Sequence, residues 1–386
     1  PPYLVKNNAS AAHAALGLPE QAYAYDAGGS YRSVIGAVRA ARAGTLLLAG
    51  DVAVTTPDSG DELERGDAAV ALLFGPADRA AVQVVATAST TAELLDLWRD
   101  PAQPVASASE DRFAVDEYRD LLDRTVARLG VTTATHVVVS ATGQRVARWA
   151  AKVLSRYGTV VDLAGVGHAG AADAVLRLVA ALQGASPGDT VLWVTLADGC
   201  DAMLLRCTEH LVAGRATPTV AEQLATGRDA RYLDVLNWRG LLDRAGPRRP
   251  PPAVPSAPAA ARNAAWKYAL VATRCENCGK VAAPPQRVCV RCGTADRMTP
   301  APLADTGATI RTFSVDRLAY SPNPPVVAAV VDFDGGGRLE VEVADADVER
   351  LRVGARVHMV FRRRYTSGGV HNYAWKARLL EEEHDG

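Results

Sequence analysis

The chain has 386 residues, 48% of them hydrophobic, and its 42 basic side chains balance 43 acidic ones to a formal charge of −1. This balance argues against a chain built around nucleic acid or an anionic membrane surface, since both need a strong basic excess. With 22% charged residues, wholesale disorder is also excluded. At roughly 150 residues per domain, the length predicts two or three domains, each able to bury a core.

No apolar run reaches the ~18–20 residues that a membrane-spanning helix needs. The longest runs, 68–74 and 190–197, have the length of strands. The N-terminal PPYLVKNNAS lacks the basic and then apolar segments of a signal peptide. We therefore expect a cytoplasmic protein without a membrane partner.

Before residue 244, short apolar strands alternate with amphipathic helices. A helix over 30–43 ends at Gly44, because glycine readily adopts the left-handed conformation that closes a helix. The pattern further predicts strands 45–50, 135–140, 159–163 and 190–197, and helices 116–129, 143–155 and 169–184. Continuous apolar strands between helices indicate a sheet covered on both faces, so we expect a layered α/β domain.

Residues 244–262 (RAGPRRPPPAVPSAPAAAR) are dominated by proline and alanine and have no period of 2 or 3.6. Such a segment is typical of a semi-rigid, extended linker, with a proline-rich loop packed on one domain as the alternative. We therefore divide the chain into parts at 1–243, 244–262, 263–300 and 301–386.

After this linker the pattern changes to short, β-branched, alternating segments. A short helix over 263–272 precedes two cysteine pairs, and Asp334-Gly335-Gly336-Gly337 marks a hairpin turn. Five strands are predicted, over 308–315, 325–333, 338–344, 356–363 and 373–380. Five short strands in ~75 residues favour a small closed barrel, most simply an OB-type β-barrel.

Four of the six cysteines form two pairs, with the spacing Cys275-x2-Cys278-x10-Cys289-x2-Cys292. A glycine follows each pair, where a tight turn needs a positive φ. Four thiolates satisfy a tetrahedral zinc ion and leave no open position, so we expect a structural zinc rather than a redox pair. The metal would supply folding energy to a ribbon that is too short to build a core.

The motif CENCGKVAAPPQRVCVRCG, followed by PNPP at 322–325 and the five strands, resembles the acyl-CoA-associated zinc-ribbon/OB-fold family over about 263–383. Members of that family accompany thiolase-superfamily enzymes. The resemblance implies that acyl-CoA or CoA is a ligand and that a thiolase-type protein is a partner.

Residues 1–240 resemble the latter two-thirds of a thiolase-superfamily protein, nearest to hydroxymethylglutaryl-CoA synthase and ketoacyl synthase III. The matching segments keep the family's order and spacing, at 23–44 (YAYDAGGSYRSVIGAVRAARAG), 64–75 (ERGDAAVALLFG), 165–199 and 230–242 (ARYLDVLNWRGLL). By this resemblance ~80–100 residues of the fold would be missing before Pro1, and half a fold leaves a sheet edge and an apolar face open.

The resemblance also places the family's catalytic positions. The cysteine nucleophile, at a helix N-terminus, falls on Asp26, the HxxN-type histidine on Ser140, and the GN asparagine on His168. An aspartate cannot form the family's acyl thioester, and the helix dipole would keep it ionised. Ser140 cannot shuttle protons near pH 7. The resemblance thus implies a degenerate active site.

Each of these positions also has a structural interpretation. Asp26 is either a general base for an aldol-type reaction or a helix cap, and His168 is either an oxyanion donor or a buried, hydrogen-bonded relic. Ser140 fits a strand-end hydroxyl better than a catalyst. Cys200 and Cys207 are expected to be buried thiols rather than nucleophiles.

Two functions follow from the resemblance. In the first, the chain binds acyl-CoA as a subunit of an acyltransferase or C–C bond-forming complex, in which a thiolase partner supplies the cysteine; a homo-oligomer fits as well. In the second, the chain alone is a non-covalent aldolase or synthase that uses Asp26 and His168. A third class, nucleic-acid binding, is disfavoured by the neutral charge and the few aromatics of the barrel.

Overall fold

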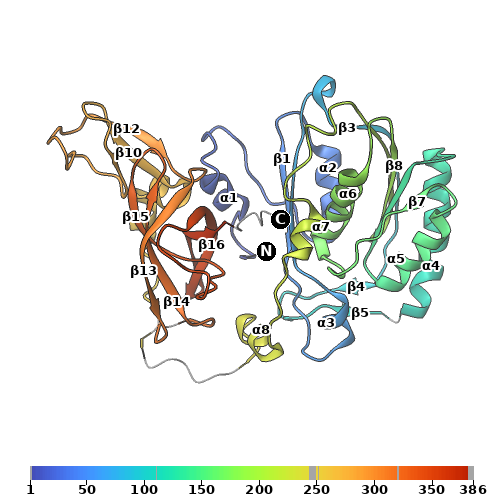
Figure 1. Cartoon of the computed structure of the whole chain (residues 1–386). Coiled ribbons are helices and arrows are strands. Elements are labelled where there is room, and N and C mark those ends of the chain that lie inside the picture. The colour runs from blue at the N-terminus through green and yellow to red at the C-terminus, as the bar shows by residue number, and fades with distance from the viewer. Residues whose placement is uncertain (1, 110, 243–248, 251, 320, 381–386) are drawn as a thin grey trace. The chain divides into compact units, whose positions relative to one another are not determined.

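The computed structural model describes residues 2–109, 111–242, 249–250, 252–319 and 321–380. The chain forms two compact units, one combining residues 1–26 with 230–386 and the other containing 27–229. We call the first the ribbon–OB unit and the second the α/β unit. The chain begins in the ribbon–OB unit, passes through the α/β unit and returns (Figure 1).

The α/β unit is built on a five-stranded mixed sheet with the strand order β3-β9-β8-β6-β7. β6 (His136–Ala141) is parallel to both of its neighbours, β7 (Thr159–Val160) and β8 (Thr190–Leu196). β9 (Gly199–Cys207) is antiparallel to β8 and to β3 (Val82–Thr91). The central strands are almost wholly buried, as a sheet covered on both faces requires.

Helices cover both faces of this sheet (Figure 1). α4 (Asp111–Leu129) and α5 (Gln144–Leu154) share one core with alternate residues of β6, while α2 (Ser33–Ala40) and α6 (Asp173–Gly184) share a second core with Val138, which points to the opposite face. In α5 the buried residues are spaced four apart, which gives the helix one apolar stripe toward the sheet.

A two-stranded antiparallel ribbon covers the outer side of α2 and α6. It consists of β1 (Leu46–Asp51) and β2 (Ala68–Leu73), and their alternate residues Leu47, Val70 and Leu72 pack into the core shared with α6. The layers are therefore helices, sheet, helices and ribbon. The predicted layered α/β domain is confirmed.

Several short elements complete the α/β unit. They are α3 (Gly60–Glu64), the 3-10 turns Ala77–Arg79 and Gly170–Ala172, β4 (Leu97–Trp98), β5 (Ser107–Ala108) and α7 (Val220–Ala225). Within the described residues of the whole chain, no helix combines the length and apolar character that crossing a membrane would need.

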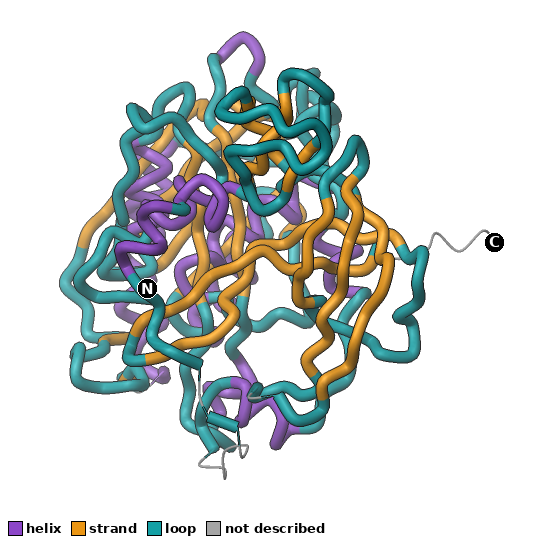
Figure 2. Tube along the Cα trace, turned by 90° about the vertical axis from the view of Figure 1, so that its left-hand side faces the viewer, coloured by secondary structure: helices purple, strands orange, loops and turns teal. Residues whose placement is uncertain are grey.

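The ribbon–OB unit contains two sheets. A three-stranded sheet, with the order β11-β10-β12, carries the cysteine pairs. A five-stranded antiparallel sheet has the order β15-β14-β13-β16-β17, and its strands are orange in Figure 2. The strand bounds are β10 Val271–Cys275, β11 Val281–Ala282, β12 Met298–Pro302, β13 Ala308–Asp316, β14 Val326–Phe333, β15 Arg338–Glu342, β16 Arg356–Ser367 and β17 Val370–Leu379.

The larger sheet matches the five predicted strands closely. Residues of β14 alternate strictly between buried and half-buried, which is the period that the sequence shows. Among the described strands the ladder does not close into a complete barrel. Its two ends meet only just beyond β15, where the backbone N–H of Ala344 donates to the carbonyl of Ala377 on β17.

Residues before Asp26 pack within the ribbon–OB unit. α1 (Ala9–Ala15) lies against α10 (Ala264–Ala269), and the Tyr3 hydroxyl accepts a 2.7 Å hydrogen bond from the backbone N–H of His371. Two further helices belong to this unit, α8 (Tyr232–Trp238) and α9 (Ala257–Arg262).

The described part of the predicted linker is not wholly extended. Ser367 Oγ donates to the carbonyl of Pro252, Val254 approaches Gly368, and residues 257–262 form α9. These contacts fit the alternative of a proline-rich loop packed on one domain. Residues 243–248 and 251 lie outside the described residues, and the domain boundaries proposed from the sequence stay predictions.

Candidate functional site

Two of the three predicted catalytic positions meet around one buried carboxylate. Ser140 lies near the end of β6, His168 lies in the loop before α6, and Asp173 is the first residue of α6. Ser140 Oγ donates a 2.6 Å hydrogen bond to Asp173 Oδ2, and His168 Nε2 lies 3.9 Å from the same oxygen. Asp173 is 1% exposed and also accepts from Arg177 Nε at 2.9 Å.

The loop that carries His168 is fixed by backbone pairing. The N–H of His168 donates to the carbonyl of Glu64 at 2.7 Å, and the N–H of Gly66 donates to the carbonyl of His168 at 3.1 Å. A side chain at Gly66 would collide with the Val166 carbonyl, and Gly167 has a φ of +73°. Glycine is therefore required where these two segments approach each other.

The imidazole of His168 is held as a neutral ring. Its Nδ1 accepts a 3.2 Å hydrogen bond from the backbone N–H of Gly170, so the proton of the neutral ring resides on Nε2. Burial lowers the pKa of His168 below its ordinary value; Arg65 and Arg177 act in the same direction, whereas Asp173 opposes them.

Asp173 remains ionised in this setting. Its burial disfavours the charged form, but the Arg177 guanidinium and the hydrogen bonds from Arg177 and Ser140 outweigh that effect and lower the pKa of the carboxyl. Its Oδ1 also accepts from the backbone N–H of Ala169 at 3.1 Å. The carboxylate thus joins strand β6, helix α6 and the His168 loop.

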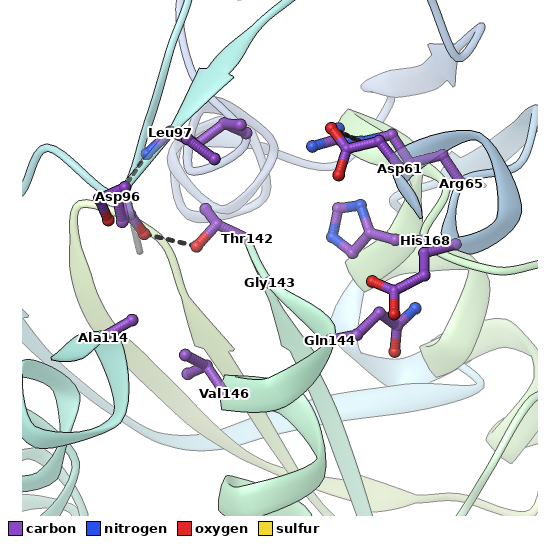
Figure 3. Close-up of a pocket in the computed structure, with 13 residues that line it drawn as sticks. Asp61, Arg65, Asp96, Leu97, Ala114, Thr142, Gly143, Gln144, Val146 and His168 are labelled. Carbon is purple, nitrogen blue, oxygen red and sulfur yellow. Dashed lines mark hydrogen bonds and ion pairs between the residues drawn. The ribbon is translucent and has the colours of Figure 1, made fainter. Parts of the chain in front are cut away.

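A small cavity of about 50 Å³ opens beside His168. Figure 3 shows His168 with Asp61 and Arg65 on one side and Asp96 with Thr142 on the other. The hydroxyls of Thr142 and Tyr118 both donate to Asp96 Oδ2 at 2.5 Å. Among the residues described as lining this cavity there is neither a cysteine nor Ser140.

Asp26 belongs to the ribbon–OB unit, whereas Ser140 and His168 belong to the α/β unit. It is exposed, and its carboxylate accepts from the backbone N–H groups of Asn8 and Ala9, both at 2.7 Å, and from Asn8 Nδ2 at 2.9 Å. Slight burial opposes ionisation, but these hydrogen bonds lower the pKa of Asp26. Asp26 therefore caps α1, not the helix α2 that follows it in sequence.

The four paired cysteines gather at one point of the ribbon–OB unit. Their sulfur atoms all lie within 4.8 Å of one another, and the Sγ atoms of Cys275 and Cys292, and of Cys278 and Cys289, are 3.6 Å apart. Thiolates at ~2.3 Å from one tetrahedral zinc lie ~3.8 Å apart, so this set fits the ion.

The remaining two cysteines are buried in β9, as predicted. Burial raises the pKa of the Cys200 thiol to about 12, and burial likewise raises that of Cys207. A protonated, inaccessible thiol is a poor nucleophile. Neither cysteine is among the residues described as lining the cavity beside His168.

Comparison with known proteins identifies the C-terminal part of the chain. Residues 262–296 match the family model of the ChsH2 rubredoxin-like zinc ribbon domain, and residues 302–362 match that of the ChsH2 C-terminal OB-fold domain. A DUF35 domain-containing scaffold protein of Methanocaldococcus jannaschii is 30% identical over 120 residues, which are 30% of this chain and 84% of that protein. This chain belongs to the DUF35 family.

The DUF35 assignment confirms the predicted zinc ribbon followed by an OB-fold. Among solved structures, one titled "Ltp2-ChsH2(DUF35) aldolase" is 22% identical, with 33% of this chain and 98% of that chain covered and a TM-score of 0.25. MvaS in complex with 3-hydroxy-3-methylglutaryl coenzyme A is 18% identical, with 66% and 75% covered and a TM-score of 0.49.

Sequence reasoning missed the groups that organise the α/β unit. Asp173 is the partner of both Ser140 and His168, yet nothing local in the sequence marks it. Arg32, next to α2, forms a buried ion pair with Asp201 of β9, and Ser89 Oγ donates to the same carboxylate at 2.6 Å. Asp201, an acidic residue inside the mostly apolar strand β9, is the signal in the sequence that could have indicated a buried partner.

Proposed function

We propose that this DUF35 protein is a scaffold subunit of an acyl-transfer or C–C bond-forming complex on acyl-CoA, and that a thiolase-type partner supplies the nucleophile. The observation that carries the proposal is the placement of the six cysteines. Four form the zinc-type cluster, two are buried in β9, and none is described as lining the cavity beside His168.

The size of the cavity supports dependence on a partner. Ligands of drug size occupy pockets of ~300–1,000 Å³, and the cavity beside His168 has only about 50 Å³. It can admit a water-sized or carbonyl-sized group but not an acyl-CoA. We infer that an acyl-CoA site beside His168 would need a surface from another chain. The proposal also places the protein in the cytoplasm, where its thiols stay reduced.

The cysteine cluster would hold one structural zinc in the proposed scaffold. The ion would supply folding energy to the ribbon, because four thiolates leave no position for water or substrate. No chemical step is therefore assigned to it. The curated relatives named as DUF35 scaffold proteins support a role in assembly.

The first experiment tests for a covalent intermediate. Purified chain is incubated with acetyl-CoA and with a medium-chain acyl-CoA, and its intact mass is measured beside that of a thiolase with an active cysteine. We expect acylation of the thiolase and none of this chain. A stable acyl adduct on this chain would overturn the proposal.

The second experiment tests for the partner. The tagged chain is purified from its source cells, co-purifying proteins are identified, and the complex is rebuilt from separately produced chains. We expect a thiolase-superfamily protein with a cysteine nucleophile, and C–C bond cleavage or formation on acyl-CoA only by the rebuilt complex. Turnover by this chain alone, abolished in Asp26→Ala, would instead establish the stand-alone aldolase.

A further inference from the structure

Ser140, His168 and Asp173 of the α/β unit lie close together. The Ser140 hydroxyl donates a 2.6 Å hydrogen bond to the carboxylate of Asp173. The same carboxylate accepts from Arg177 Nε at 2.9 Å and lies 3.9 Å from His168 Nε2. All of this lies inside the fold, because Ser140, His168 and Asp173 are 4%, 6% and 1% exposed.

One nitrogen of His168 is engaged by the protein, and the other faces the Asp173 carboxylate. The N–H of Gly170 donates to Nδ1 at 3.2 Å, and Nε2 lies 3.9 Å from Asp173 Oδ2. Ser140 is equally committed, since its only hydrogen can donate once and points to Asp173. Ser140 is not among the residues described as lining the cavity, and a ligand there would meet His168 with its Nδ1 already engaged.

We propose that Asp173 is a positioning residue: it binds the Ser140 hydroxyl and the backbone N–H of Ala169 next to His168, and so keeps Ser140 and the His168 loop in a buried network instead of presenting them to a ligand in the cavity. The inference goes beyond the proposed function, because it concerns how these side chains are held and not which partner binds.

Other charged groups around His168 do not replace this role. Arg65 and Arg177 face the ring, but both favour its neutral form, whereas Asp173 favours the charged form. Arg65 is occupied by the hydroxyl of Tyr31 at 2.7 Å, and Tyr31 also packs against the imidazole, with 5.2 Å between ring centres. Removal of the Asp173 charge therefore moves the titration of His168 in one defined direction.

The test uses the full chain labelled with ¹⁵N at its seven histidines. The His168 signals are assigned by their loss in His168→Gln. In the unaltered protein we expect a neutral ring with the proton on Nε2, unchanged on titration with CoA. In Asp173→Asn we expect His168 to titrate at lower pH or not at all. A matched control is Asp189→Asn, because Asp189 lies 3.3 Å from His136 Nε2 and should move only the His136 signals.

Unfolding experiments supply the second readout. If Asp173 binds Ser140 as described, the Ser140→Ala and Asp173→Asn variants are non-additive, and the double variant loses less stability than the two single losses combined. If Asp173→Asn does not fold, the protonated ring nitrogen of His168 in the unaltered protein and the stability of the Ser140→Ala variant still test the inference.

Three results would overturn the inference. They are a proton on Nδ1 of His168, a His168 titration unaffected by Asp173→Asn, and a His168 signal that shifts on addition of CoA. Failure to find a thiolase partner would contradict the proposed function but would not affect the Asp173 network. The two proposals can therefore be tested independently.

Discussion

Arg32 and Asp201 are joined by two hydrogen bonds, from Nε to Oδ2 at 2.7 Å and from Nη2 to Oδ1 at 3.3 Å. The Arg32 side chain is 18% exposed and that of Asp201 is 5% exposed, so the pair lies largely outside water. It fastens the start of α2 to strand β9.

Arg32→Met is expected to lower the free energy of unfolding by about 3 kcal/mol, because it leaves the buried Asp201 carboxylate with only the Ser89 hydroxyl and the more distant, half-exposed Arg39. The measurement is urea unfolding at neutral pH. Arg39→Met is the matched control, since Arg39 lies 3.8 Å from the same carboxylate but is 45% exposed. Its loss should stay within about 0.5 kcal/mol. Equal losses in both variants would contradict the assignment.

Stability should fall as the pH drops below about 6.5, partly through His168. Burial lowers the pKa of folded His168 below 6.5, while in the unfolded chain it stays near that value. Below pH 6.5 His168 therefore binds a proton in the unfolded state but not in the folded state, and the free energy of unfolding decreases. We expect His168→Gln to flatten the slope of unfolding free energy between pH 6.5 and about 5. His358 shifts in the same direction, so a smaller slope remains until it too is replaced.

Cys200 and Cys207 should resist alkylation in the folded protein. Cys200 has a pKa of about 12, and both thiols are buried. Iodoacetamide treatment at pH 8, followed by peptide mapping, should leave both unmodified until denaturant is added. Rapid modification of Cys200 under native conditions would show an accessible thiolate and weaken the case against a nucleophile in this chain.

Loss of one cluster cysteine should abolish metal binding. Cys275→Ser is expected to lower the metal content from one zinc per chain to nearly none and to lower the melting temperature of the ribbon–OB unit, because metal binding and folding are coupled. Cys207→Ala is the control and should keep its zinc. Metal analysis and thermal unfolding provide the readouts, and full zinc retention by Cys275→Ser would contradict the ligand set.

Asp26→Ala should act on stability rather than on chemistry. The change removes the acceptor for the backbone N–H groups of Asn8 and Ala9, and the loss of such a cap costs about 1 kcal/mol. Glu20→Ala, an exposed change in the same segment, is the control. The free energy of unfolding is measured for both variants. If Asp26→Ala loses no more stability than Glu20→Ala, Asp26 does not cap α1.

The sequence anticipates the parts of the fold with a strong local period. Strand β14 alternates between buried and half-buried residues, and α5 has apolar residues four apart, so both were predicted within a residue or two of their observed bounds. Strand β3 was missed, since its small residues, as in Ala86–Thr91, give no clear apolar alternation.

The candidate site was only partly predictable, because its partners are distant in sequence. Ser140 and His168 came from a family resemblance, but Asp173 lies 33 residues from Ser140 and forms no motif with it. Asp26 was expected to adjoin the helix that follows it, and a helix cap was one of its two interpretations. The helix that it caps, α1, lies before it, a pairing that only the three-dimensional structure could show.

The return of the chain to its first unit has a consequence for proteolysis. The α/β unit is joined to the ribbon–OB unit by two covalent connections, one after Asp26 and one before Ala230. A single cut in either connection leaves the other intact, so a nicked chain still holds both units in one molecule. A preparation that appears as two fragments under denaturing conditions can thus behave as one particle in solution.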